Sequence, residues 1–155
     1  MVRFASEDDL DEIIELLKEV NLVHHNLRPD LFKIGVKYTK EDLIKILEDE
    51  NKKIFVYLDD DNKVLGHAFI NILEETNTNL FEIHKTVYID DICVDEEVRG
   101  RHIGHALYDN VLNYAKSINA YNITLNVWTG NDSAYNFYEK LGFKEYKKGM
   151  EVIIK

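Results

Sequence analysis

The pattern of apolar and polar residues predicts helices and strands in a mixed order. Apolar positions at helical spacing predict four helices, over residues 10–20, 40–47, 103–117 and 132–140. Short apolar or alternating runs predict strands over residues 2–5, 54–58, 64–73, 84–94 and 122–127, with further strands near 144 and over 150–154. This order predicts an α/β (α+β) fold, in which a mixed β-sheet carries helices on both faces.

The chain-breaking residues predict one domain over residues 1–155. Pro29 is the only proline and glycine is scarce, so no flexible or proline-rich linker divides the sequence. Ser6, followed by acidic residues, is a predicted N-cap of the first helix. Pro29 lies in a stretch without clear periodicity, residues 22–38, and the polar cluster at 59–62 predicts a hairpin turn.

Composition narrows the partners that this domain can have. The chain has 19 basic and 29 acidic residues, which gives a net charge of −10. Nucleic-acid binders concentrate excess Lys and Arg on one face, so we expect no nucleic-acid partner, whereas an acidic field attracts cations such as amines.

The expected location is the cytoplasm, and we expect no membrane partner. Cys93 is the only cysteine, which excludes an internal disulfide and fits a reducing compartment. The first residues carry no basic and apolar signal segment, and no apolar run approaches the roughly 20 residues of a membrane span.

The segment that follows the strand 84–94 predicts an anion site. A short acidic turn leads into the start of an amphipathic helix, where unpaired backbone N–H groups and the helix dipole favour negative charge. Two glycines allow a close approach to the backbone, and two arginines fit a diphosphate better than a carboxylate. The residues of this turn are Arg99, Gly100, Arg101, His102, Ile103 and Gly104.

Two motifs in the second half of the chain resemble those of the GNAT superfamily of N-acetyltransferases. Arg99-x-x-His102-x-Gly104 resembles the pyrophosphate-loop signature, with His102 at a position that is usually small. Residues 131–143, NDSAYNFYEKLGF, resemble the family's second motif. The resemblance covers essentially the whole chain and implies a GNAT-like acyl-CoA N-acyltransferase fold.

The resemblance also implies that the acyl donor is acetyl-CoA. Main-chain groups of the strand would face the pantetheine arm, the loop would hold the diphosphate, and an asparagine would add a hydrogen bond. The predicted cofactor-binding residues are Ile92, Cys93, Val94, Arg99, Gly100, Arg101, His102, Ile103, Gly104, His105 and Asn131.

Tyr138 and Asp90 are the predicted catalytic residues. The resemblance places Tyr138 beside the leaving sulfur, and a phenol that stays protonated at neutral pH can donate a proton there. Asp90 and Asp91 resemble the acidic pair of polyamine acetyltransferases; Asp90 would accept the amine proton through a water, and Asp91 would bind the acceptor. Adjacent residues of a regular strand face opposite sides, so a β-bulge, which the resemblance implies here, would be needed to bring both to one cleft.

Other reactive side chains have simpler interpretations. A lone buried cysteine such as Cys93 is usually a small hydrophobe, so we do not expect it to take the acetyl group. His24 and His25 could recognise the amine, although a solvated or helix-terminating pair is the more common arrangement. The histidine spacings do not match a metal site, so no metal is predicted.

The predicted activity is direct transfer of an acetyl group to the primary amine of a small cationic molecule. A protein or peptide N-acetyltransferase and a sensor module that binds acyl-CoA without catalysis are the alternatives. Edge strands and residues 150–154 could build a homodimer, as often happens in the resembling family.

Overall fold

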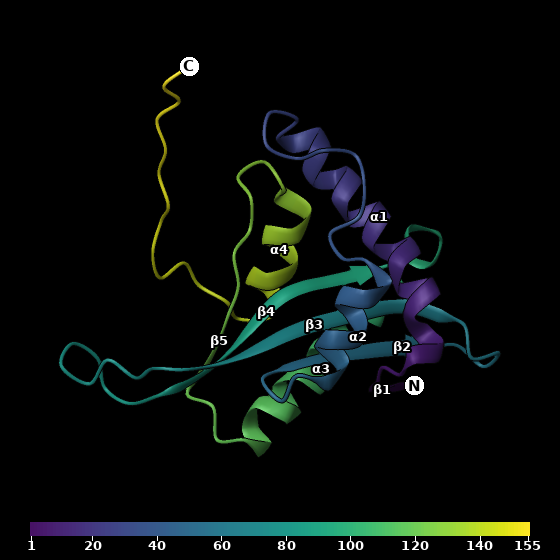
Figure 1. The fold of residues 1–155 in the computed structure, drawn as a ribbon, viewed down its shortest axis with the longest axis horizontal. Coiled ribbons are helices and arrows are strands. Elements are labelled where there is room, and N and C mark those ends of the chain that lie inside the picture. Colours follow the sequence, from purple (N-terminus) through teal and green to yellow (C-terminus); the bar gives the residue numbers. More distant parts are fainter.

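Five strands form one sheet in the order β1-β2-β3-β4-β5 in the computed structural model, which describes residues 1–155 (Figure 1). The first four strands pair antiparallel, and β5 is parallel to β4. The strands are β1 (Val2–Phe4), β2 (Lys52–Leu58), β3 (Val64–Glu74), β4 (Lys85–Val94) and β5 (Asn122–Thr124). The helices are α1 (Leu10–Leu27), α2 (Lys40–Glu48), α3 (Ile103–Ser117) and α4 (Asp132–Lys140), with short 3-10 helices η1 (Glu7–Asp9) and η2 (Glu96–Val98).

Helices cover both faces of this sheet, as the sequence predicts. One hydrophobic cluster joins α1 and α2 to residues such as Val56 and Phe69. A second cluster joins α3 to the opposite face, with Ile70 and Ile89 among its members. None of the helices combines the length and the apolarity that crossing a bilayer would require.

Local polar contacts fix where the first helices begin. Thr39 and Asp42 form a reciprocal cap at α2, since the Asp42 N–H donates to Thr39 Oγ1 (3.2 Å) and the Thr39 N–H donates to Asp42 Oδ2 (3.0 Å). Ser6 precedes η1, the first helical turn, and its N–H donates to Asp9 Oδ2 at 2.7 Å. These two caps pair backbone N–H groups at the start of η1 and of α2 and so fix where each begins.

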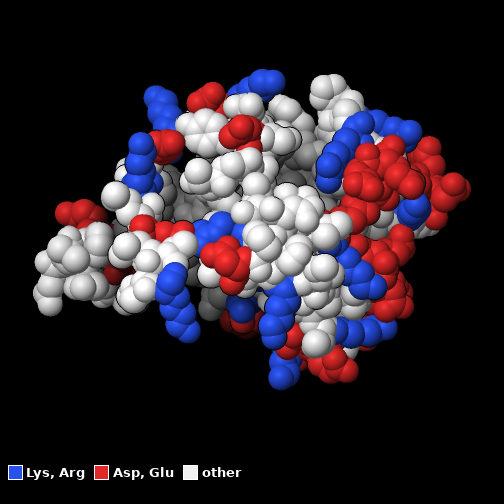
Figure 2. All heavy atoms as spheres, turned by 90° about the horizontal axis from the view of Figure 1, so that it is seen from above, with Lys and Arg blue, Asp and Glu red and all other residues white.

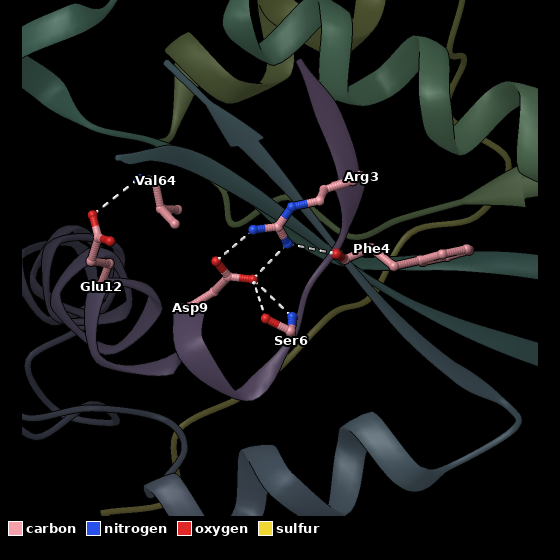
Figure 3. A network of polar contacts seen from close by, with 6 residues as sticks. All are labelled: Arg3, Phe4, Ser6, Asp9, Glu12 and Val64. Atoms are coloured by element: carbon pink, nitrogen blue, oxygen red, sulfur yellow. Dashed lines mark hydrogen bonds and ion pairs between the residues drawn. The ribbon is translucent and has the colours of Figure 1, made fainter. Parts of the chain in front are cut away.

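A partly buried ion pair connects β1 to this helical start. Arg3 donates to both carboxylate oxygens of Asp9, at 2.8 and 3.0 Å, and the Asp9 side chain is buried (Figure 3). Beside it, Glu12 on α1 accepts a hydrogen bond from the Val64 N–H at 3.0 Å. The start of α1 is thereby tied to two strands of the sheet.

The strand β4 contains the β-bulge that the resemblance implies. Phe69 pairs with Asp91 and the next residue of β3, Ile70, pairs with Ile89, so Asp90 is the extra residue. The pairing of β4 with β5 stops at Tyr88, which lies opposite Thr124. Residues 89–94 therefore have no strand partner on the β5 side.

Several predicted boundaries are wrong. The first helix continues to Leu27, because nothing breaks it before Pro29, so His24 and His25 lie on α1 and not in an irregular stretch. The strand 122–127 ends at Thr124, where β5 leaves β4. Neither of the strands predicted near 144 and over 150–154 is present, since residues 144–155 have no partner strand in the chain.

The last part of the chain contributes no fully buried residue to the hydrophobic core, although Ile123, Leu125 and Phe143 pack against the second cluster from its edge. Ala115 is the last buried residue, so β5, α4 and everything after them have only partly buried or exposed side chains. Beyond Phe143 no backbone group forms a hydrogen bond, and residues 144–155 leave α4 in an extended path (Figure 1).

Candidate active site

A row of unpaired backbone N–H groups lies between β4 and α3. The N–H groups of residues 99–105 find no acceptor in the chain. Gly100 has φ +88° and His102, the N-cap of α3, has φ +60°, so the backbone turns sharply just before the helix. Such a turn at a helix N-terminus binds anions, and the side chains of Arg99 and Arg101 are exposed beside it. These groups fit a diphosphate.

The two glycines of this loop have different surroundings. A Cβ on Gly100 would meet no atom within 4 Å, so the backbone there is open to a ligand. A Cβ on Gly104 would lie 3.2 Å from the ring of Phe137 on α4. Gly104 therefore lets α4 pack against the start of α3, and the exposed His102 side chain lies outside this contact.

The bulge turns both carboxylates of the acidic pair toward the face covered by α1 and α2. Asp90 Oδ2 accepts hydrogen bonds from Lys37 Nζ at 2.8 Å and from the Tyr38 hydroxyl at 3.0 Å. Burial lowers the pKa of Lys37, but the hydrogen bond and charge of Asp90 outweigh burial and leave this pKa raised. The Lys37 ammonium and the Tyr38 hydroxyl thus share one carboxylate oxygen of Asp90.

Asp91 has a different partner, the fully buried His67 of β3. Its Oδ2 lies 2.7 Å from His67 Nε2, while His67 Nδ1 is buried without a partner. A neutral imidazole with its proton on Nε2 fits these contacts, because it donates to the carboxylate and leaves no buried N–H unpaired. His67 thus holds the Asp91 carboxylate in one orientation.

Tyr138 lies on α4 with its ring between Phe137 and Phe143, at centroid distances of 5.1 and 5.5 Å. Burial raises the pKa of the Tyr138 phenol, and the negative charge of Asp91 raises it further. The phenol therefore keeps its proton at neutral pH, and Tyr138 and Asp91 act on each other electrostatically.

Cys93 and Asn131 have partners that explain their positions. The Cys93 thiol is buried and donates to the Leu16 carbonyl, with its sulfur 3.4 Å from that oxygen. Burial strongly raises the pKa of this thiol, and the Asp91 charge adds to the effect, so the reactive thiolate is disfavoured. Asn131 caps α4, because its Oδ1 accepts a hydrogen bond from the Ala134 N–H at 3.3 Å.

The two adjacent histidines of α1 have separate surroundings. His25 Nδ1 lies 2.6 Å from the Phe32 carbonyl oxygen and so links the helix to the loop after it. His24 packs against the Phe32 ring at 5.2 Å, and burial lowers its pKa, partly offset by the charge of Asp91. The negative charge of Asp91 thus acts on the His24 ring.

The loop after α1 reaches across to the segment that follows β5. Phe32 meets the Trp128 ring edge to face at 5.4 Å, and the Arg28 guanidinium lies 5.9 Å from the centroid of the same ring. Further along, this loop supplies Lys37 and Tyr38 to Asp90. It therefore lines one wall of the candidate site.

Three residues of the site were missed from the sequence: His67, Lys37 and Tyr38. A histidine within the apolar run VLGHAFI was a usable signal for His67, because an uncharged run rarely contains a titratable group without a partner. Lys37 and Tyr38 carried no such signal, since their contacts depend on the path of an irregular loop.

The comparisons with known proteins agree on one family. A model of the acetyltransferase (GNAT) family matches residues 15–143. An uncharacterized N-acetyltransferase of Methanocaldococcus jannaschii is 28% identical over 144 residues, which cover 93% of this chain. The chain spans 60% of the length of that curated relative.

Solved structures share the fold over the full chain. A mutant of the BH1408 protein from Bacillus halodurans has a TM-score of 0.96 and 28% identity, with 100% of this chain and 99% of that chain covered. The aminoglycoside N-acetyltransferase AAC(6')-Iy, solved in complex with CoA, has a TM-score of 0.75 and 15% identity, with 100% and 99% covered. The second similarity shows the fold alone.

Proposed function

We propose, since the chain belongs to the GNAT family of acetyltransferases, that it is an acyltransferase. It would transfer an acetyl group from acetyl-CoA directly to the primary amine of a small cationic acceptor. The observation that carries the proposal is the contact of Lys37 with Asp90. A primary ammonium is bound there by the carboxylate oxygen that also accepts from the Tyr38 hydroxyl, beside the part of β4 that has no strand partner on the β5 side. A substrate amine in place of Lys37 would meet the same carboxylate oxygen.

The residues between β4 and α3 would hold the donor. The unpaired N–H groups of residues 99–105, with Arg99 and Arg101, would bind the diphosphate, and the free side of residues 89–94 would pair with the amide-bearing arm. When bound, acetyl-CoA supplies an activated thioester carbonyl and a thiolate leaving group. A backbone N–H of the unpaired stretch is the natural donor to the developing oxyanion.

The acidic pair would prepare the amine. The ammonium form of a primary amine has a pKa of about 10.4, so removing its proton at neutral pH costs roughly 4 to 5 kcal/mol. We assign Asp90 as the base, directly or through a water, once the acceptor has displaced Lys37. Asp91 would bind the acceptor, and His67 would be the positioning residue that holds Asp91.

Tyr138 would complete the transfer by protonating the leaving sulfur. Its raised pKa keeps the phenol in the acid form, which a donor to a thiolate of pKa about 8.5 requires. The buried, hydrogen-bonded Cys93 has no part in this scheme, so the acetyl group passes in one step from donor to amine.

A small acceptor is favoured over a peptide by the contact between Phe32 and Trp128. This contact connects the loop after α1 to the segment after β5, where a peptide groove would need to stay open. The acidic balance of the chain favours a cationic acceptor, and the lone, buried Cys93 suits a reducing compartment such as the cytoplasm.

An acceptor screen tests the proposal. The chain is incubated with acetyl-CoA and with polyamines, aminoglycosides, amino acids and N-terminal peptides, and acetylated products are measured by mass spectrometry. We expect turnover with a small polycationic amine. Preference for peptides or for an anionic acceptor would contradict the proposal, and tight CoA binding by calorimetry without any turnover would support a sensor instead.

A lysine substitution tests the displacement step. Lys37→Met removes the internal ammonium, so the KM for a cationic acceptor should fall severalfold while the affinity for CoA stays unchanged. Lys33→Met is the matched control, because Lys33 lies in the same exposed loop and has no contact with Asp90. An unchanged KM in Lys37→Met would show that the acceptor does not bind at Asp90.

A further inference from the structure

The ammonium group of Lys37 is held at Asp90, the residue that we assign as the base. Lys37 Nζ donates to Asp90 Oδ2 at 2.8 Å and lies 5.2 Å from the centroid of the Tyr38 ring. The Asp90 side chain is 15% exposed and that of Lys37 is 48% exposed, so the lysine covers the carboxylate from the solvent side. Lys37 therefore occupies the position that an acceptor amine would take.

The loop that carries Lys37 is fixed on one side of this residue and loosely packed on the other. The Tyr38 ring stacks on Phe69 of β3 at a centroid distance of 5.7 Å, which fixes the residue after Lys37. Before Lys37, Ile34 is 75% exposed, and a Cβ on Gly35 would meet no atom within 4 Å. The amine is thus tethered beside the base, while the loop before it has space to adjust.

The other groups of the proposed transfer lie near the same β-bulge. Burial raises the pKa of the Tyr138 phenol, and the charge of Asp91, the residue after Asp90, raises it further. Residues 89–94, with which the arm of the donor would pair, have no strand partner on the β5 side. An amine tethered at Asp90 would therefore meet the thioester at a high effective concentration.

We propose that the chain acetylates its own Lys37 when it binds acetyl-CoA, with Lys37 Nζ in place of the substrate amine. The reaction rests on the proposed function, because it uses the same donor, base and acid. Asp90 takes one proton from the ammonium, and the Nζ lone pair forms a bond to the acetyl carbonyl carbon. The C–S bond breaks with its electron pair on the sulfur, which receives a proton from Tyr138. A second proton leaves the nitrogen and restores the phenol, so the products are N-acetyl-lysine, free CoA and one proton.

Uncatalysed acetylation would have a different distribution over the lysines. Burial lowers the pKa of Lys37, but the hydrogen bond and charge of Asp90 outweigh burial and leave this pKa raised. An ammonium group has no lone pair with which to attack, so spontaneous acetylation should favour the exposed Lys33 of the same loop. A preference for Lys37 would therefore come from the site and not from intrinsic nucleophilicity.

Mass spectrometry of peptides from the chain locates the modification. The chain is incubated without an acceptor, with acetyl-CoA that carries a deuterated acetyl group, and initial rates are measured at Lys37 and Lys33. Lys37 should react at least about 10-fold faster, because its amine is tethered, and its rate per chain should not change with protein concentration. In parallel, the N-hydroxysuccinimide ester of acetic acid, which needs no enzyme, should modify Lys33 faster. The same preference for Lys37 with both reagents, or a rate that rises with protein concentration, would overturn the proposal.

Two variants separate catalysis at Lys37 from simple accessibility. Tyr138→Phe leaves the lysine in place and should lower its acetylation by acetyl-CoA about 100-fold, in the range of general acid catalysis. Asp90→Asn removes the base and releases the ammonium. Acetylation of Lys37 by acetyl-CoA should then fall, while its acetylation by the ester should rise. Equal or faster acetylation by acetyl-CoA in Asp90→Asn would show that Lys37 is merely reactive.

The acceptor screen, run on the same preparations, distinguishes failure of self-acetylation from failure of the proposed function. Turnover of a free amine beside an unmodified Lys37 would contradict self-acetylation alone. Binding of CoA with neither product would contradict the proposed function as well. The mass gain of the intact protein should be lost in Lys37→Arg and retained in the matched control Lys33→Arg.

Discussion

The single extra residue of β4, Asp90, brings two carboxylates to one face of the sheet in the candidate site. Without the bulge at Asp90, the two carboxylates would face opposite sides of the sheet, one toward α3 and one toward α1 and α2. With it, Asp90 meets Lys37 and Tyr38, while Asp91 meets His67. Two carboxylates on one face, each with its own partner, can take separate roles.

Replacement of Tyr138 tests the acid role at this scale. Tyr138→Phe removes only the hydroxyl, so kcat should fall about 100-fold, in the range of general acid catalysis, while the affinity for CoA changes little. Steady-state kinetics and calorimetry measure the two quantities. Tyr135→Phe, an exposed tyrosine of the same helix, should behave as the parent. Equal turnover in Tyr138→Phe would remove the phenol from the mechanism.

The Arg3–Asp9 pair gives a stability prediction with a defined pH dependence. Burial raises the pKa of Asp9, but the hydrogen bonds from Arg3 and Ser6 outweigh burial and leave this pKa lowered. A lowered carboxyl pKa stabilises the fold above the ordinary value of about 4, and this stability is lost as the pH falls through the lowered pKa.

Asp9→Asn should therefore cost about 1 to 3 kcal/mol of unfolding free energy at pH 7, because it leaves Arg3 without its charged partner. The difference should shrink as the pH drops below about 4. Urea denaturation at pH 7 and pH 3 measures both values. Asp8→Asn, at an exposed neighbour, is the control, and an equal loss at the two pH values would refute the assignment to the carboxylate.

At the scale of elements, the sequence predicted those helix boundaries that nearby turn and capping residues determine. The boundaries of α3 and α4 were predicted to the residue, because a sharp turn precedes Ile103 and the Asn131 cap precedes Asp132. The acidic pair and Tyr138 were singled out as candidates for the same reason, since each lies in a compact motif, and their roles stay predictions. The strands expected near 144 and over 150–154 are absent. A strand needs a hydrogen-bonded neighbouring strand, and apolar alternation along the sequence does not show whether the fold supplies one.

The loop between β4 and α3 supports a prediction about the donor. Arg101→Ala or Arg99→Ala should each raise the CoA dissociation constant about 3- to 10-fold, the loss of one exposed charge-assisted contact. Lys116→Ala, in the last turn of α3, is the control. Pantetheine, which has no diphosphate, should bind the parent and the variants equally. An equal loss of pantetheine affinity in the variants would show that the arginines do not act through the diphosphate.

At the scale of the whole molecule, the negative charge is unevenly distributed. Acidic side chains gather at the right-hand end in Figure 2, while other parts of that face show mixed charge or none. The total of −10 combines this acidic body with a positive 144–155 segment and with Arg99 and Arg101 at the start of α3. Such a field should attract a cationic acceptor from solution.

Ionic strength tests this long-range attraction. Raising the salt from about 0.05 to 0.5 M shortens the Debye length severalfold, so kcat/KM for a polycationic acceptor should fall several times. A monoamine with a single charge should show a much smaller decrease, and it serves as the comparison in the same buffers. Equal salt dependence for both acceptors would show that the field does not guide the substrate.

The position of the last buried residue has a consequence for synthesis. A ribosome adds residues from the N-terminal side, and every core residue from Leu10 to Ala115 is made before β5 begins. The sheet from β1 to β4 and its covering helices α1 to α3 can therefore condense while the second motif is still being translated. Tyr138, the proposed proton donor, is then added after the fully buried core residues have been made, so substitutions in α4 should cost little in folding.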